Sequence, residues 1–588
     1  MDKFNGSSEK PLRSETTPLF QKEIVRRRLP GVKLQENVYV TMRDGIKIAV
    51  DIYRPETEGR YPGLLSMSPY MKEIQQHPPQ WSHSIEAGGT GFFVPKGYVH
   101  VIAQSRGSGR SQGKWNFLDT KEQQDGYDLI EWMAQQPWCD GNIGMIGDSY
   151  WGWIQYLVAA QKPPHLKCIV PNDGGTDHYR DTFYPGGIFI GGDFANAWIV
   201  DTIFQCSWPG PIEGKLPPTN FADDVGSHPN DGPYYWERSP WTKLDQIDVP
   251  VLSLVANGAF VHYRGQLEGY PKIKAVKKLI VEPETGFWPH VYFVMNRPLN
   301  EQVLRWLDHW LKGIDTGIMK EPEVAIFDTA IREWRYENEY PLKRTEWTKF
   351  YLRSNRSGSA NDPPYGLLST DSPGDEAPDS YLVPESTYRL LSGKPVLAYA
   401  TSPLKEDVRV WGPLSAVLHG SSTSLDTAWF IKLMDVGPDD KMKFLSRGIL
   451  RASYRDVDET RSTPGQPFHP FQKRIPLEPK KIYEFQIEML PVFHTFKAGH
   501  RIWLQIASDD LTYFGALHSL DVFELPMPCE NSVYHDSVHP SHLLLPVIPD
   551  APIIKAVEPP LSQVTWPLTP GIWWPNTSGW PLTADRQD

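Results

Sequence analysis

Cysteine is scarce in this sequence. Only four cysteines occur in 588 residues, at positions 139, 168, 206 and 529, and no two of them form a Cys-x-x-Cys pair. This scarcity and spacing argue against a disulfide framework and against a cysteine-based zinc site. We therefore expect a protein of the reducing cytoplasm.

Long apolar runs and an excess of basic residues are absent too. No segment approaches the 18 or so uninterrupted apolar residues of a membrane span, and the N-terminal arm, residues 1–34, lacks the apolar core of a secretory signal. The formal net charge of −12 is spread along the chain, whereas binding of nucleic acid requires a basic face. We expect neither a membrane nor a nucleic acid as partner.

Motifs that bind cofactors are missing as well. The glycine-rich stretch 104–113 reads QSRGSGRSQG, which has neither Gly-x-Gly-x-x-Gly spacing nor the Gly-Lys-Ser/Thr ending of a phosphate loop. No group of His, Asp and Glu has metal-ligand spacing. We expect no cofactor and no metal.

What the sequence does contain is alternation of strand and helix signals. In 35–173 and again in 246–317, short apolar runs alternate with helix-patterned segments, which predicts a mostly parallel sheet covered on both faces. Within the first range, NVYVTMRDGIKIAVDIYRP predicts a hairpin that turns at Asp44-Gly45. The stretch between the two ranges, 174–245, is rich in glycine, proline and aromatics, and we interpret it as an insertion over the sheet. In 318–588 short β-type runs predict a β-sandwich or jelly roll.

One short stretch has the pattern of a catalytic turn. Residues 141–160 read GNIGMIGDSYWGWIQYLVAA, a strand-like run followed by a glycine-flanked serine, Ser149, and a helix-like segment. Glycines allow a turn sharp enough to push the serine hydroxyl out above the sheet, and the next backbone N–H then faces the same spot. The alternative is an ordinary glycine-rich turn with an exposed serine.

The serine turn is one of several segments that resemble a single family. The others include SMSPYMK (66–72), the stretch 104–113, DHYRDTFYPGG (177–187), VRVWGPLSAVLHG (408–420) and FKAGHRIWLQIASDD (496–510). Together they resemble the CocE/NonD hydrolases, the family of cocaine esterase, α-amino-acid ester hydrolases and X-Pro dipeptidyl peptidases. The resemblance implies an α/β-hydrolase domain with an inserted cap and a C-terminal β jelly-roll domain. It also implies Ser149 as nucleophile, with the Tyr150 N–H and the Tyr70 phenol as oxyanion donors.

The acid and the base of the triad depart from the family pattern. In the family, the acid of the triad lies in a Gly-Trp-x-Asp segment after the strand equivalent to VPVLSLV. Here the corresponding segment begins at Asn257, and residues 251–267 contain no Asp or Glu. The position that corresponds to the family's histidine is occupied here by Gly286. His290, four residues later, is our candidate base. The candidates for the group that orients this base are Asn257, Glu282 and Glu284. The alternative candidate for the base itself is His262.

Aromatic residues are abundant around the turn and in the insertion. Such residues favour an apolar pocket for a bulky hydrophobic or aromatic small molecule. The pocket residues we predict are Trp151, Phe183, Tyr184, Trp198, Phe260 and Trp288.

The function we predict is that of a serine hydrolase that cleaves an ester or an amide through an acyl-enzyme. Two other hypotheses remain open: a lyase, cyclase or isomerase that uses Ser149 and Tyr70 as hydrogen-bond donors, and a catalytically inactive binding protein. Self-association into a homo-oligomer is also left open.

Overall fold

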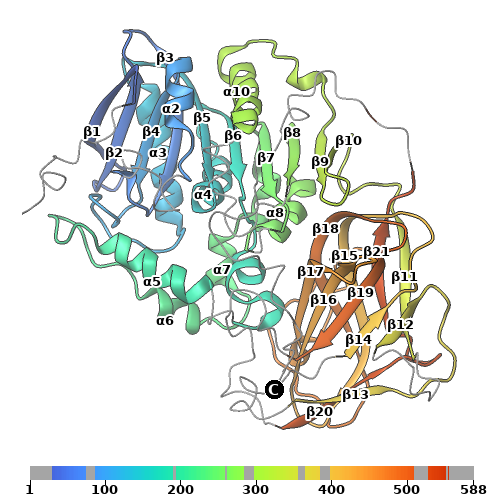
Figure 1. Cartoon of the computed structure of the whole chain (residues 1–588). Helices are drawn as coiled ribbons and strands as arrows, with labels where there is room; N and C mark the ends of the chain where they lie inside the picture. The colour runs from blue at the N-terminus through green and yellow to red at the C-terminus, as the bar shows by residue number, and fades with distance from the viewer. Residues whose placement is uncertain are drawn as a thin grey trace, which may run out of the picture.

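Two large sheets form two lobes that lie side by side (Figure 1). The computed structural model describes residues 29–73, 86–189, 194–258, 261–283, 297–354, 365–383, 397–508, 528–550 and 554. None of the helices within these ranges is long and apolar enough to cross a membrane.

The first sheet has ten strands in the order β1-β2-β4-β3-β5-β6-β7-β8-β9-β10. From β4 to β9 in this order all neighbours run parallel, while β1, β2 and β10 pair antiparallel at the two edges. The strand bounds are β1 Val32–Thr41, β2 Lys47–Pro55, β3 Tyr61–Ser68, β4 Val99–Gln104, β5 Cys139–Asp148, β6 Leu166–Asn172, β7 Val251–Ala256, β8 Lys277–Glu282, β9 Val324–Asp328 and β10 Glu333–Glu337.

The predicted hairpin is confirmed, since β1 and β2 pair with Thr41 opposite Lys47 and Gly45 takes a φ of 85° in the turn. Strands β9 and β10 lie in the range that we assigned to the C-terminal domain, 318–588, but β9 pairs with β8 and both extend the first sheet.

Helices cover both faces of this sheet. Successive strand residues point to opposite faces, so Met145 packs in the core beneath α3 (Thr120–Ala134) and α4 (Tyr150–Ala160), and Ile146 packs against α10 (Arg297–Lys312). The two shorter helices of this lobe are α2 (Thr90–Phe93) and α8 (Tyr263–Gly269).

The insertion after β6 contributes the helical turn η3 (His178–Phe183) and the helices α5 (Phe194–Ser207), α6 (Phe221–Gly226) and α7 (Pro233–Arg238). Figure 1 shows α5 and α6 along one end of the first sheet. Backbone hydrogen bonds join this cap to the loop after β4, for example from the Leu216 N–H to the Gly113 carbonyl at 2.8 Å. The cap therefore lies at the edge where the parallel strands end.

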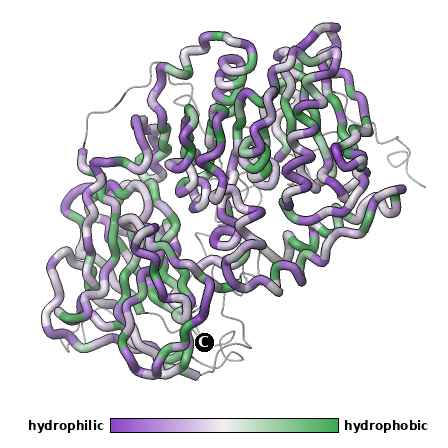
Figure 2. The backbone as a smooth tube through the Cα atoms, turned by 180° about the vertical axis from the view of Figure 1, so that it is seen from behind, coloured by the Kyte–Doolittle hydropathy of each residue, from purple (hydrophilic) through white to green (hydrophobic). Residues whose placement is uncertain are grey.

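The second sheet has eleven strands and is barrel-like, because β21 pairs with β11 and also with β15. Its order is β13-β20-β15-β18-β17-β16-β19-β14-β12-β11-β21. The bounds are β11 Glu346–Arg353, β12 Gly366–Ser369, β13 Asp379–Val383, β14 Leu397–Ala400, β15 Val408–Ser422, β16 Ala428–Val436, β17 Met442–Arg451, β18 Tyr483–Phe496, β19 Arg501–Ala507, β20 Cys529–Tyr534 and β21 His542–Val547. Apolar residues gather along the strands of both lobes (Figure 2).

Candidate active site

Ser149 lies at a sharp turn between β5 and α4. Its backbone has φ 59° and ψ −121°, a conformation that costs a residue with a side chain roughly 1–3 kcal/mol. Hydrogen bonds hold it in place: the Ser149 N–H donates to the Asn172 carbonyl at 3.0 Å, and the Ser149 carbonyl accepts from the Trp153 N–H at 2.8 Å. The serine is 5% exposed. A strained backbone that the surroundings fix in this way is typical of a functional position.

The glycines around the serine are sterically required. A Cβ on Gly147 would lie 2.4 Å from the Cβ of Trp151, and Gly147 has a φ of 140°. A Cβ on Gly152 would lie 2.6 Å from the Asn172 carbonyl oxygen, the same oxygen that accepts the Ser149 N–H. A side chain at position 147 would therefore push α4 away from β5, and a side chain at position 152 would push it away from β6.

Tyr70 follows β3 and packs directly against the serine turn. Its ring centroid lies 5.9 Å from that of Tyr150 and 6.4 Å from that of Trp151, the two residues after Ser149. The phenol is buried, and its oxygen accepts a hydrogen bond from the Trp198 indole at 2.7 Å. Burial, and next the nearby charge of Glu86, raise the pKa of Tyr70 well above its ordinary value, so the phenol stays a neutral donor.

The Tyr150 side chain points away from this place. Its phenol donates to both carboxylate oxygens of Glu122 on α3, at 3.0 and 2.9 Å, inside the core. Only the backbone of Tyr150 remains for the site, and N–H groups in the first turn of a helix have no acceptor within the helix. This geometry is compatible with the backbone role that the sequence predicts for Tyr150.

Asn257 and Glu282 lie on neighbouring strands at the same edge. Asn257 directly follows β7, and its side-chain oxygen accepts the Tyr263 phenol at 2.8 Å. Glu282 ends β8, pairs in register with Ala256 and is buried. Burial, then the charge of Asp148, raise the pKa of Glu282 to about 8. Among the residues that the structure describes, no donor reaches Glu282 Oε1.

Three further buried carboxyl groups lie at this edge. The Asp148 side chain accepts from Asn172 at 3.1 Å, and Asp173 accepts the Ala256 N–H at 2.8 Å. The Glu86 carbonyl accepts the Asp148 N–H at 2.9 Å. Burial, followed by the charges of Asp148 and Asp173, raises the pKa of Glu86 well above its ordinary range. Sequence reasoning missed Glu86 and Asp173; the position of Asp173 directly after a strand was the only available signal.

The alternative base, His262, is buried at the start of α8. Its Nδ1 accepts the Trp153 indole N–H at 3.1 Å, so this ring nitrogen is already used inside the core. Four other predicted site residues, Phe260, Glu284, Trp288 and His290, lie outside the described residues.

The predicted pocket aromatics separate into different environments. Phe183 and Trp198 pack together, with centroids 6.1 Å apart, and both contact Phe117. Tyr184 stacks on Tyr179 instead, at 5.3 Å. Trp151 is fully buried beside Tyr70. Of the four described residues, Trp151 and Trp198 therefore lie at the serine turn through their contacts with Tyr70.

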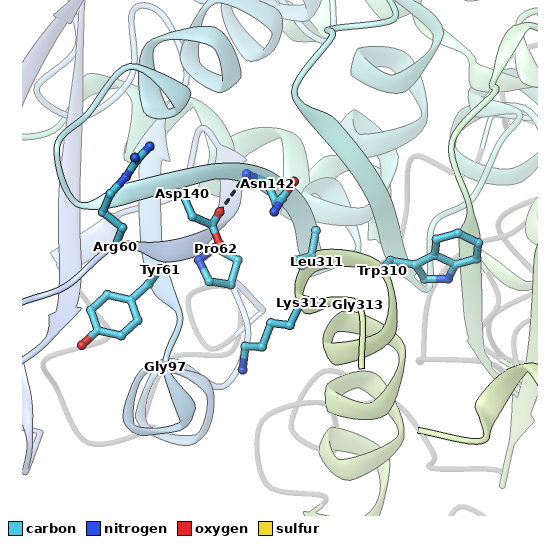
Figure 3. A pocket seen from close by; sticks show the side chains of 10 residues that line it. All are labelled: Arg60, Tyr61, Pro62, Gly97, Asp140, Asn142, Trp310, Leu311, Lys312 and Gly313. Carbon is cyan, nitrogen blue, oxygen red and sulfur yellow. Dashed lines mark hydrogen bonds between the residues drawn. The ribbon is translucent and has the colours of Figure 1, made fainter. Parts of the chain in front are cut away.

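A hollow of about 670 Å³ lies at the opposite end of the first sheet (Figure 3). It is lined by Arg60, Tyr61, Pro62, Gly97, Asp140, Asn142, Trp310, Leu311, Lys312 and Gly313. Asp140 is near the start of β5 and Ser149 follows its end, so about nine strand residues, roughly 30 Å, separate the hollow from the serine. The hollow is therefore not part of the serine site.

Two family models match most of the chain. Residues 44–292 match the X-Pro dipeptidyl-peptidase (S15 family), and residues 316–544 match the X-Pro dipeptidyl-peptidase C-terminal non-catalytic domain.

Individual relatives and a solved structure agree with these matches. Cocaine esterase of Rhodococcus sp. is 30% identical over 595 residues, which cover 87% of this chain and 98% of the esterase. A putative serine esterase of Mycobacterium bovis is 26% identical over 631 residues, covering 87% and 95%. The crystal structure of a CocE/NonD family hydrolase from Staphylococcus aureus has a TM-score of 0.77 at 23% identity, over 88% of this chain and 94% of that one. At this identity the structural match establishes the fold alone.

Proposed function

Since this chain belongs to the CocE/NonD family of X-Pro dipeptidyl-peptidase-like hydrolases, we propose that it hydrolyses esters of bulky hydrophobic or aromatic groups through an acyl-enzyme on Ser149. It is an enzyme of the carboxylic ester hydrolase class, as its relatives are. The strand order of the first sheet, with Ser149 after β5 and the cap after β6, supports an α/β-hydrolase domain. The closed second sheet supports a jelly-roll domain.

The backbone of Ser149 is the observation that carries this proposal. A φ of 59° at a strand-to-helix turn presents the serine oxygen at the carboxyl edge of the parallel sheet. The oxygen attacks the ester carbonyl, and a base takes its proton. The Tyr150 N–H and the Tyr70 phenol stabilise the oxyanion, which collapses to expel the alcohol and leave an acyl-enzyme that water hydrolyses.

Glu282 is the better supported of the two described candidates for orienting the base. The Asn257 oxygen is engaged by the Tyr263 phenol, whereas Glu282 Oε1 has no donor among the described residues. When ionised, a buried carboxyl stabilises an adjacent imidazolium strongly, because little water screens the charge. His290, eight residues further along the chain, remains our candidate base.

The cap supports the proposed substrate class. Trp198 brings an apolar ring to the serine turn and packs on Phe183, and apolar rings with few polar anchors suit an aromatic or aliphatic acyl group. The four cysteines all lie in the described residues, are buried and form no disulfide with one another, which fits our assignment to the cytoplasm.

Fluorophosphonate labelling tests the nucleophile. We expect the wild-type chain to be labelled, and Ser149→Ala to lose the label together with the hydrolysis of 4-nitrophenyl butyrate. Ser239→Ala is the matched control, because Ser239 is also a buried serine but lies in the cap after α7. Labelling that persists in Ser149→Ala would exclude the covalent mechanism. Absence of labelling in the wild type would favour the non-hydrolytic or binding alternatives.

A further inference from the structure

Helix α5 of the cap contacts the Tyr70–Met71 segment at two points. The Trp198 indole donates to the Tyr70 oxygen at 2.7 Å, and the side-chain oxygen of Gln205, in the last turn of the helix, accepts the Met71 N–H at 3.2 Å. The spacing of seven residues places both side chains on one face of α5. Val200 and Phe204, on another face, are 67% and 62% exposed. The inner face of α5 therefore holds the segment that carries the phenol.

The direction of the Trp198 bond restricts what the Tyr70 hydroxyl can do. An indole N–H only donates, so the phenol oxygen must accept along this direction, and its single proton points elsewhere. A hydroxyl that accepts one hydrogen bond also becomes a stronger donor in the next, because the bonds polarise one another. The indole thus both orients and strengthens the phenol as a donor.

We infer that Trp198 is a positioning residue of the oxyanion site: its indole N–H turns the Tyr70 proton toward the developing oxyanion. This inference rests on the proposed function, in which Tyr70 stabilises the oxyanion. It makes the cap part of the catalytic arrangement, beyond its role in covering the substrate. The bond joins residues 128 positions apart in the chain.

A double-mutant cycle tests the inference. Trp198→Phe keeps a ring but removes the N–H, and we expect kcat for 4-nitrophenyl butyrate to fall about tenfold while KM changes less than about twofold. Tyr70→Phe is expected to lower kcat by about 10²–10³-fold. In the Tyr70→Phe background, Trp198→Phe should have no further effect on kcat, because the group that it orients is gone.

The control and a second variant separate orientation from packing. Trp306→Phe shortens another fully buried tryptophan, on α10 across the sheet, and should leave kcat unchanged. Trp198→His keeps a ring N–H and should retain more of kcat than Trp198→Phe, with thermal unfolding checked for each variant. If Trp198→Phe does not fold, Trp198→His is compared with the wild type instead: most of kcat should be retained, and a loss of about tenfold or more would count against the inference.

The outcomes distinguish the inference from the proposed function. An equal loss of kcat from Trp198→Phe in both backgrounds, or no loss in either, would overturn the inference and leave the serine mechanism standing. Equal kcat for Trp198→His and Trp198→Phe would also count against it. Unchanged kcat in Tyr70→Phe would instead remove Tyr70 from the proposed function itself.

Discussion

Glu282 illustrates how a single residue acquires its properties from its place in the fold. Within the sequence it is one glutamate at the end of a strand-like run. In the structure β7 and the core surround it, and burial, together with Asp148, raises its pKa to about 8 from an ordinary value of 4.5. The folded chain therefore holds a proton that the unfolded chain releases over this range.

Stability should depend on pH through this proton. The stabilisation is fully present below about pH 4.5 and is lost as the pH rises through about 8, so the free energy of unfolding falls over this window. Glu282→Gln has no titrating proton and should flatten the dependence by up to about 1.4 kcal/mol per pH unit. Denaturant unfolding at pH 5, 7 and 9 measures this pH dependence of the free energy of unfolding. The exposed Glu58→Gln is the control, and identical slopes for wild type and Glu282→Gln would contradict the assignment.

The same substitution tests the orienting role of Glu282. If it orients the base, Glu282→Gln should lower kcat by about a hundredfold or more, whereas Asn257→Ala should lower it far less. Initial rates with 4-nitrophenyl butyrate at pH 9, where Glu282 is ionised because its pKa is about 8, decide between them. A larger loss in Asn257→Ala would reverse the two assignments.

At the scale of elements, the junction of β5 with α4 determines the position of Ser149. Close approach of α4 to the end of β6 is possible because Gly152 faces the Asn172 carbonyl without a side chain. The same carbonyl accepts the Ser149 N–H, so the packing of the helix and the serine conformation depend on one contact.

Gly152→Ala should disturb both the packing of α4 against β6 and the conformation of Ser149. The added Cβ would overlap a backbone oxygen, and overpacking of this kind costs about 1–3 kcal/mol. We expect a lower unfolding temperature and slower fluorophosphonate labelling of Ser149. In contrast, Gly226→Ala adds a Cβ with nothing within 4 Å and should change neither measurement. Wild-type stability and labelling in Gly152→Ala would show that the contact can relax freely.

For the molecule as a whole, buried ion pairs connect the two lobes and the cap. Arg264 of α8 contacts Glu488 of β18 at 2.8 Å, Asp181 of the cap at 3.0 Å and Glu268 at 2.8 Å. A second buried arginine, Arg180 of the cap, donates to the His469 carbonyl in the C-terminal lobe at 2.7 Å. Charges buried together in this way favour one arrangement of the lobes, since separation would leave carboxylates without a cation.

Arg264→Met should therefore destabilise the whole chain. Asp181, which is buried, and Glu268 and Glu488, which are partly buried, would lose their shared cation; loss of a buried partner typically costs about 3–5 kcal/mol. Calorimetry should show a lower unfolding temperature and a broader or divided transition as the lobes uncouple. Lys320→Met breaks an exposed pair with Asp315 and should leave the transition unchanged. An unaltered single transition in Arg264→Met would contradict this role.

Local patterns explain what could be predicted. The β1–β2 hairpin and the strand–turn–helix at Ser149 depend on near neighbours, namely a turn glycine and glycines on both sides of the serine. The order of strands in the sheets and the closure of β21 onto β15 depend on pairings between distant segments, which no local pattern specifies.

By itself the sequence determined the serine turn, because the glycines at 147 and 152 are needed wherever that turn is built. It also determined the family, through motifs along most of the chain. Only the tertiary structure decided that Trp198 donates to Tyr70, that Tyr263 engages Asn257 and that Glu282 is buried enough to keep its proton. Hydrogen bonds between distant residues, and the dielectric around a carboxyl, exist only after the chain has folded.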